Sequence, residues 1–333
     1  MITLGDVFRR FADDYCQVHG RSLLPSHGRA IADILACRTP ALGGHRWRCN
    51  QCSAEVHAYH SCKNRSCPTC HRNETERWLA ARKAELLPCP YFHVTVTVPA
   101  VLHTWTHQLV YHPHVHCLVT GGGVSADGRS WCPSRTDYLL PTKALARLVC
   151  GKLRAALAKR RPDLVVPEAV WKKPWVADCT AWGNGTDAVL EYLARYVHRV
   201  AITNSRIVDL DDSGVTIGHK DRGSGRSLRT RLSGHEFMRR FLQHVLPKGL
   251  HKIRYYGLWH PSRREQAACA RQLLQLDQPA NASRATTATE ARDDAATTVP
   301  ASGTAEPLRV CPCCKEGRLV QVGRLYPKQA SGP

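Results

Sequence analysis

The sequence lacks any apolar run approaching the ~18 residues that a membrane-spanning helix needs, and no charged-then-apolar leader opens it. The first absence excludes membrane-spanning helices. The second leads us to expect a reducing compartment, where disulfides do not persist. Acidic residues are also few: 27 Asp and Glu stand against 47 Lys and Arg in 333 residues, for a net charge of +20. Such an excess indicates a polyanionic partner, and without a membrane segment we favour nucleic acid.

The sequence contains 16 cysteines, which need an explanation other than disulfides. Cys49 and Cys52 form one Cys-x-x-Cys knuckle, and Cys67 and Cys70 form a second. The gap between the knuckles has the length found in two-knuckle zinc ribbons, where four thiolates surround one ion. The sequence therefore predicts a structural Zn²⁺ bound by these four cysteines.

Other potential zinc ligands leave alternatives open. Four nearby side chains could replace a ligand, or could simply pack or face solvent: Cys62, His57, His60 and His71. Cys62 could also join a second site. Near the C-terminus, Cys311 and Cys314 form a knuckle with no second one nearby in the sequence, so a partial zinc site and no metal site both remain open.

Three histidines, His112, His114 and His116, recur at a spacing of two. Because side chains alternate along a strand, all three would project from one face. Three glycines follow at residues 121–123, where the strand should end. A row of imidazoles on one face is a suitable platform for a divalent metal. The alternative is a half-exposed strand that carries histidines by chance.

Alternating β-branched residues predict a strand over residues 91–98, and residues 101–109 and 114–120 add two more strands of a small sheet. Only Pro99 and Ala100 separate the first two. Strands joined that tightly should form an antiparallel hairpin, because a parallel pair needs roughly a dozen linking residues. We further expect helices over residues 1–40, 73–87, 141–160, 186–200 and 234–246, and short strands over 175–179, 201–208 and 214–219.

The helix expected after residue 186 carries Tyr192 and Tyr196, which share a face because they lie four residues apart, with Arg195 and Arg199 close by. A tyrosine pair on a helix usually packs against a neighbour. Beside a metal-binding strand in a very basic chain, it indicates phosphoryl chemistry instead. A tyrosine can attack a DNA phosphate while a metal polarises the phosphate oxygens.

Three stretches together resemble a known family. They are His-Pro-His-Val-His-Cys-Leu-Val from residue 112, Ser-Cys-Lys-Asn-Arg-Ser-Cys-Pro-Thr-Cys from residue 61, and Tyr-Leu-Ala-Arg-Tyr-Val-His-Arg-Val-Ala-Ile from residue 192. The first contains the His-hydrophobe-His motif of HUH single-strand endonucleases. The combination resembles the two-tyrosine, IS91-type transposases of rolling-circle insertion sequences, over residues 5–265.

The resemblance implies an α+β fold, in which an HUH endonuclease-like antiparallel sheet with helices follows a zinc-ribbon domain. We accordingly expect a helical and zinc-binding domain over residues 1–90 and a transposase catalytic domain over residues 91–265. A mostly disordered tail over residues 266–333 would contain the last Cys-x-x-Cys. The resemblance also implies a bacterial cytoplasmic enzyme that joins the nucleoid when bound to DNA, and it leaves the oligomeric state open.

The resemblance also assigns roles to residues. His114 and His116 would ligate Mg²⁺ or Mn²⁺, with His103 as third ligand, or else His107 or Gln108. Tyr192 and Tyr196 would cut single-stranded DNA of the element ends and target. Each cut would leave a 5′-phosphotyrosine and a free 3′-hydroxyl, and reversal would rejoin the strands without ATP. The DNA backbone would be bound by five arginines: Arg195, Arg199, Arg206, Arg229 and Arg231.

The chain departs from the family pattern between residues 98 and 101, where the family has a longer helical connection. This departure implies an internal deletion near residues 99–100 that removes a helix covering the sheet. A catalytically impaired, zinc-containing DNA-binding remnant is therefore the alternative function. Two further classes share single features: histidine-triad nucleotide hydrolases have the His-x-His-x-His row, and replication initiators or relaxases share the chemistry.

Overall fold

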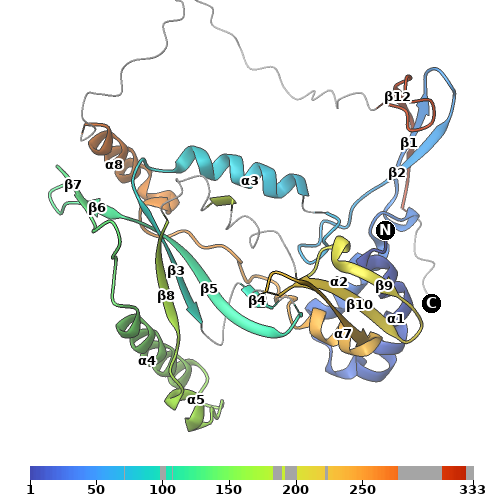
Figure 1. Cartoon of the computed structure of the whole chain (residues 1–333). Coiled ribbons are helices and arrows are strands. Elements are labelled where there is room, and N and C mark those ends of the chain that lie inside the picture. The colour runs from blue at the N-terminus through green and yellow to red at the C-terminus, as the bar shows by residue number, and fades with distance from the viewer. Residues whose placement is uncertain are drawn as a thin grey trace, which may run out of the picture. The chain divides into compact units, whose positions relative to one another are not determined.

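The computed structural model describes residues 1–70, 72–97, 103–106, 108–182, 190–191, 201–221, 224–276 and 310–327 (Figure 1). The chain forms two compact units: Met1–Leu35 with Lys63–Asp277, and Ala36–Cys62 with Gln278–Pro333. Each unit combines two separate stretches of the chain, whereas the expected domains, divided at residues 90 and 265, follow one another along the sequence. The expected domain boundaries stay a prediction. Across the described ranges, no helix has the length and apolar character needed to cross a membrane.

Helices form where the sequence has amphipathic patterns. The first begins at a capping box, in which Asp6 N donates to the Thr3 hydroxyl (3.2 Å) and Thr3 N donates to the Asp6 carboxylate (2.7 Å). The helices expected over residues 1–40, 73–87, 141–160 and 234–246 are confirmed. The described helices are α1 (Leu4–His19), α2 (Pro25–Ala36), α3 (Arg72–Glu85), α4 (Thr142–Arg160), α5 (Glu168–Lys172), α7 (Gly234–Leu242) and α8 (Arg264–Leu276).

One part of the first unit packs α1 and α7 together beside a three-stranded sheet of order β11-β10-β9. The strands are β9 (Ile207–Leu210), β10 (Gly214–Lys220) and β11 (Ser227–Ser233). The Phe8 and Phe241 rings meet edge to face at 5.4 Å between centroids. The strand expected over 201–208 begins only at Ile207, because a 3₁₀ turn occupies 204–206. The polar, mostly exposed β11 gave no sequence signal.

Gly234 lets α7 approach α1, which gives a testable expectation. A Cβ built on Gly234 would overlap the Phe11 ring. We expect Gly234→Ala to lower the free energy of unfolding by about 1–3 kcal/mol, because the buried ring must move. Gly151, in the middle of α4, has open space around its Cβ position. Gly151→Ala should therefore be neutral or stabilising by up to about 1 kcal/mol. Denaturant titration of both variants checks the opposite signs, and equal effects would contradict the packing argument.

The histidine strand lies in a four-stranded antiparallel sheet of order β4-β5-β3-β8 (Figure 1). Its strands are β3 (Tyr91–Thr97), β4 (His103–Trp105), β5 (Tyr111–Thr120) and β8 (Ala177–Trp182). The expected hairpin between the first two strands is wrong, since β5 lies between β3 and β4. Thr97 and His103 pair with the same residue, His114, from opposite sides of β5. Two antiparallel pairings thus leave β3 and β4 parallel, two positions apart.

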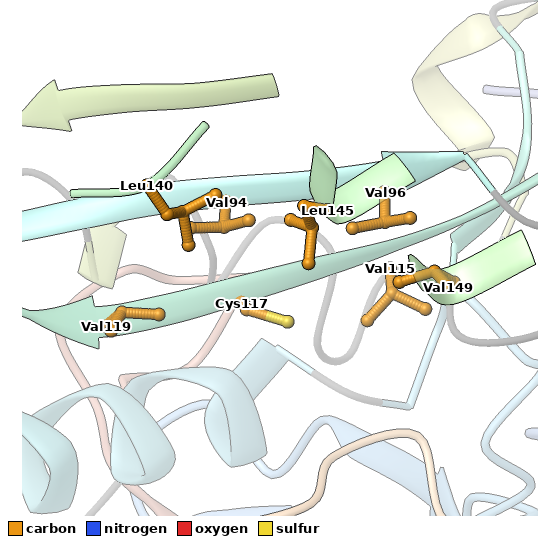
Figure 2. A pocket seen from close by; sticks show the side chains of 8 residues that line it. All are labelled: Val94, Val96, Val115, Cys117, Val119, Leu140, Leu145 and Val149. Atoms are coloured by element: carbon orange, nitrogen blue, oxygen red, sulfur yellow. The ribbon is translucent and has the colours of Figure 1, made fainter. Parts of the chain in front are cut away.

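The other face of this sheet is apolar and packs against α4. Alternate residues of β3, namely Phe92, Val94 and Val96, are buried there with side chains of β5, β8 and α4. A cavity of about 390 Å³ remains between sheet and helix (Figure 2). It is lined by Val94, Val96, Val115, Cys117, Val119, Leu140, Leu145 and Val149. Hydrophobic alternation therefore fixes which face carries the histidines.

The segment after residue 265 was expected to begin as a fraying helix and then to be mostly disordered, and the structure has the helix α8 there. In α8, Ala270 and Leu274 are buried against Leu87, Tyr91 and Trp131, so α8 belongs to the core of the first unit. Trp131 lies in a small hairpin of β6 (Gly122–Val124) and β7 (Trp131–Pro133). Residues 277–309, also expected to be disordered, lie outside the described residues.

The second unit contains a three-stranded antiparallel sheet of order β12-β1-β2. Its strands are β1 (Gly44–Cys49), β2 (Glu55–Tyr59) and β12 (Leu319–Leu325). The central strand β1 pairs with β2 on one side and with β12 on the other, from Gly44↔Leu325 to Cys49↔Leu319. The tail that was expected to be mostly disordered thus supplies one strand of this sheet.

Candidate metal centres

The row of histidines projects as the period of two predicts. His112, His114 and His116 alternate along β5 with Val115 and Cys117, which face the apolar side. The His114 and His116 rings meet at 4.7 Å between centroids, and His112 and His114 at 5.2 Å. His114 and His116 are half-buried, whereas His112 is exposed. The two inner imidazoles are therefore the pair that a metal could bind away from bulk water.

A fourth histidine, His93 of β3, joins this face. Its Nε2 lies 2.8 Å from Nδ1 of His116, and the two rings stack at 5.0 Å with an interplanar angle of 10°. Thr95, opposite His116 in the strand register, places its hydroxyl 3.4 Å from both nitrogens. His93 was not predicted from the sequence, although its place in the predicted strand over 91–98, two residues before Thr95, was a usable signal.

Hydrogen bonds select one ring nitrogen in each inner histidine. Nδ1 of His114 lies 2.8 Å from the carbonyl oxygen of His112, and because a carbonyl can only accept, His114 carries its proton on Nδ1. Nδ1 of His116 is engaged by His93. Nε2 is then the nitrogen through which each of the two rings could bind a metal. Metal-binding histidines commonly use their other ring nitrogen in this way.

Burial favours the neutral form of His93 and of His116. Burial, together with the charges of His114 and His93, lowers the pKa of His116 to about 3. Burial also lowers the pKa of His93, against the opposing effect of the Asp178 carboxylate. Asp178 lies on β8 opposite Thr95 and accepts a hydrogen bond from Thr180 (3.0 Å). Neutral imidazoles beside a carboxylate suit a divalent cation, and Asp178 is a second residue that the sequence argument missed.

The third ligand expected for this site is not tested. The backbone of His103 pairs with that of His114, but the His103 side chain and residue 107 lie outside the described residues. Gln108 is exposed, with its amide nitrogen 3.4 Å from Nε2 of His219 on β10. Gln108 thus contacts a different sheet in this structure.

The cysteines form two groups, each with all Sγ atoms within 4.8 Å of one another: Cys37, Cys62, Cys67 and Cys70, and Cys49, Cys52, Cys311 and Cys314. The prediction that Cys49, Cys52, Cys67 and Cys70 share one ion is therefore wrong, because the structure divides them between the groups. Within the described residues, His114 and His116 are not part of any such group of three or more ligands. Four thiolates per group match the donor set of a structural Zn²⁺ site.

Comparisons with known proteins agree with this geometry. Residues 7–98 match a family described as "Transposase zinc-binding domain", and residues 98–267 match one described as "Putative transposase". The chain is 35% identical to "Putative transposase y4qJ" of Sinorhizobium fredii over 96% of this chain and 94% of that protein. The chain belongs to the IS91-type transposases. It is also 23% identical, over 68% of each chain, to the transposase for insertion sequence element IS801 of Pseudomonas savastanoi pv. phaseolicola. No solved structure matches it.

Of the other residues predicted to act in this transposase, only some lie in the described part of the chain. Tyr192, Tyr196, Arg195 and Arg199 lie outside the described residues, although Leu190 and Glu191 just before them are helical.

Arg206 donates from Nε to the Gly218 carbonyl (2.9 Å), and burial lowers its pKa, so it supports β10 from within the transposase fold. Arg231 is exposed but donates to the Asp211 carboxylate at 2.6 Å. Arg229 is exposed on β11. Arg206 and Arg231 already bind other groups of the protein, so Arg229 is the best placed of the three to contact a DNA phosphate.

Proposed function

We propose that this transposase nicks and rejoins single-stranded DNA at the ends of its insertion sequence through a 5′-phosphotyrosine intermediate, in rolling-circle transposition. The observation that supports the proposal most strongly is the pair His114 and His116, which share one face of the sheet and each have Nδ1 held by a neighbour. Such a pair on a central strand serves no evident packing purpose, because the apolar face of the same strand already fills the core.

The donor set fits Mg²⁺ or Mn²⁺ when oxygen ligands complete it. Imidazole nitrogens favour Mn²⁺, which is the transition metal of the two, whereas carboxylate and water ligands suit either ion. His114 and His116 would hold it through Nε2, with His103 as the proposed third ligand and Asp178 on the same face. When bound, the ion supplies a Lewis acid that polarises the scissile phosphate.

The tyrosines supply the bond chemistry. The Oη atom of Tyr192 or Tyr196 forms a bond to phosphorus, the bond from phosphorus to the 3′ oxygen breaks, and that oxygen leaves with a proton as a free 3′-hydroxyl. A 3′-hydroxyl from a second strand can then attack the phosphotyrosine and release the tyrosine. The number of phosphodiester bonds is conserved, which is why no ATP is needed. Two tyrosines permit two such exchanges without release of the DNA.

Basic side chains support the choice of DNA as partner. Helix α4 contains six Lys or Arg and no Asp or Glu, and all six side chains are exposed: Lys143, Arg147, Lys152, Arg154, Lys159 and Arg160. Arg229 adds an exposed charge on β11. Contacts of this type bind phosphates without reading sequence, so affinity should fall steeply with salt. We also propose a structural Zn²⁺ on Cys37, Cys62, Cys67 and Cys70, all inside the matched zinc-binding domain.

A covalent trapping assay tests the proposal. A 3′-labelled single strand from an element end is incubated with Mn²⁺ and run on a denaturing gel, since a 5′-phosphotyrosine retains the 3′ fragment. We expect a labelled adduct with the natural chain and with Tyr138→Phe, an exposed tyrosine before α4. Tyr192→Phe with Tyr196→Phe should abolish the adduct, and His114→Ala should reduce it to the metal-free level. An adduct that persists in the double tyrosine variant would refute the mechanism.

One observation favours a second candidate, an impaired DNA-binding remnant. The alignment with the Sinorhizobium relative spans 382 positions, more than the 333 residues of this chain, so gaps in this chain stand opposite residues of the relative. Only residues 98–102 connect β3 and β4, where the family resemblance implies a longer helical connection. Zinc and DNA binding without any adduct would establish this candidate.

A further inference from the structure

The described part of the second unit, residues 36–62 and 310–327, contains only a small apolar core. Three of its buried residues form a cluster, Cys49, Cys311 and Leu319, and two of these are cysteines. Trp47 and Val56 are partly buried against them. Units of roughly 40 residues usually need a disulfide, a metal or a partner in addition to such a core. The cysteines in this core are therefore the first place to look for the stabilising element.

The sulfur positions match a tetrahedral ion rather than disulfides. Sγ of Cys49 lies 3.7 Å from Sγ of Cys314, and Sγ of Cys52 lies 3.7 Å from Sγ of Cys311. A disulfide would bring two sulfurs to about 2.05 Å. Four thiolates at the usual Zn–S distance of about 2.3 Å are separated from one another by about 3.8 Å. The observed spacing is thus that of the edges of a zinc tetrathiolate.

The two knuckles are also built alike. Cys49 N donates to the Ala54 carbonyl (2.9 Å), and Cys311 N donates to the Gly317 carbonyl (2.7 Å), which closes each turn. Each turn has a non-glycine residue with positive φ four positions after its first cysteine, Ser53 at 60° and Lys315 at 61°.

Backbone amides also point at the sulfurs in both knuckles. In the first, Gln51 N lies 3.4 Å from Sγ of Cys49, and in the second, Cys313 N lies 3.4 Å from Sγ of Cys311. Gly317 N lies 3.2 Å from Sγ of Cys314. Such N–H groups stabilise the charged thiolate form that a metal requires. Two equivalent turns facing each other are the architecture of a closed, four-cysteine zinc site.

We propose that Cys49, Cys52, Cys311 and Cys314 bind a second structural Zn²⁺, which fastens the C-terminal segment onto β1 near the start of the chain. Cys311 and Cys314 lie outside both matched family regions, residues 7–98 and 98–267. The C-terminal knuckle thus completes a metal module that begins more than 250 residues earlier. Because zinc binding stabilises the folded state alone, the second unit should depend on the ion for its fold.

Zinc content per chain tests the site in the full-length protein. The natural chain should release two zinc ions, one per cysteine group. Cys311→Ser with Cys314→Ser should release one, and so should Cys52→Ser. The combination of all three changes should still release one, because all remove the same site. Cys313 is exposed and outside both groups, so Cys313→Ser should keep two.

A fifth variant avoids changing any ligand. A Cβ built on Gly317 would overlap Sγ of Cys49 and crowd Asn50. Gly317→Ala should therefore also release one zinc ion. Replacement of zinc by Co²⁺ reports the ligands directly, since the thiolate charge-transfer absorption should fall by half in the Cys311→Ser, Cys314→Ser chain. Full zinc content in that chain, or loss of a further ion when Cys52→Ser is added to it, would overturn the proposal.

A cleavage experiment tests whether zinc holds the C-terminal segment on β1. A specific protease site is inserted between residues 290 and 300 of the full chain and cut after purification. The C-terminal fragment should co-elute with the rest in gel filtration and dissociate when a zinc chelator is added. With Cys311→Ser and Cys314→Ser it should dissociate without chelator, and with Cys313→Ser it should behave like the natural sequence. A fragment that stays bound in the presence of chelator would show that the strand pairing of β12 suffices without metal.

Discussion

Replacing His93 with alanine should weaken divalent-metal binding at the histidine face about 10- to 100-fold while leaving the sheet folded. His93 is a positioning residue in this site: its Nε2 lies 2.8 Å from Nδ1 of His116 and its ring stacks on the same imidazole. Without it, His116 can rotate or place its proton on Nε2, the nitrogen proposed to bind the metal. Mn²⁺ titration followed by calorimetry or electron paramagnetic resonance measures the loss.

The chain offers two matched controls for this prediction. His93→Gln keeps a polar group able to hydrogen-bond Nδ1 of His116, so it should recover most of the affinity. His112→Ala should bind Mn²⁺ normally, because His114 uses the backbone carbonyl of His112, which the substitution retains. Unchanged affinity in His93→Ala would mean that His116 needs no support. A loss that Gln does not rescue would make His93 a ligand rather than a positioning residue.

The histidine face could be predicted because it depends on local periodicity. Side chains at 112, 114 and 116 must share a face in any strand, whatever its neighbours. His93 and Asp178 could not be placed beside them in the same way. Their positions depend on β3 and β8 pairing in a particular register, Thr95↔His116 and Thr95↔Asp178, which is set by the packing of the whole sheet.

The grouping of the cysteines also depends on contacts between distant parts of the chain, which the sequence alone did not predict. Cys49, Cys52, Cys67 and Cys70 were predicted to bind a metal, and the structure places each of them in a group of four cysteines. Spacing along the chain, however, favoured joining Cys49 and Cys52 to the nearest knuckle. The structure joins them to cysteines 259 and 265 residues away. Nothing in local sequence encodes that choice, because it follows from the antiparallel pairing of β1 with β12. Similarly, the order β4-β5-β3 overturned a hairpin that loop length alone had favoured.

A buried histidine away from the metal face should make folding stability depend on pH. His244, after α7, is 3% exposed, and its Nε2–H donates to the Leu109 carbonyl (3.2 Å), while its ring stacks on Tyr111 at 6.1 Å between centroids. Burial lowers its pKa from 6.5 to about 4, the charge of Lys252 adds to this effect, and the bond to Leu109 opposes it. His244 is therefore protonated near pH 6.5 in the unfolded chain, but only near pH 4 in the folded chain.

Stability must then fall as the pH is lowered through this window, since the unfolded state binds more protons there. Linkage with these two pKa values gives a loss of about 2 kcal/mol between pH 7 and pH 5. His244→Gln can still donate to the Leu109 carbonyl but does not titrate, so its loss should be about 2 kcal/mol smaller. Denaturant titrations at both pH values measure this difference, in which contributions from zinc sites cancel. His251→Gln, at an exposed position, should lose as much as the natural chain. An equal pH dependence in the natural chain and His244→Gln would mean that His244 is protonated in the fold, and that its buried bond to Leu109 does not resist acid.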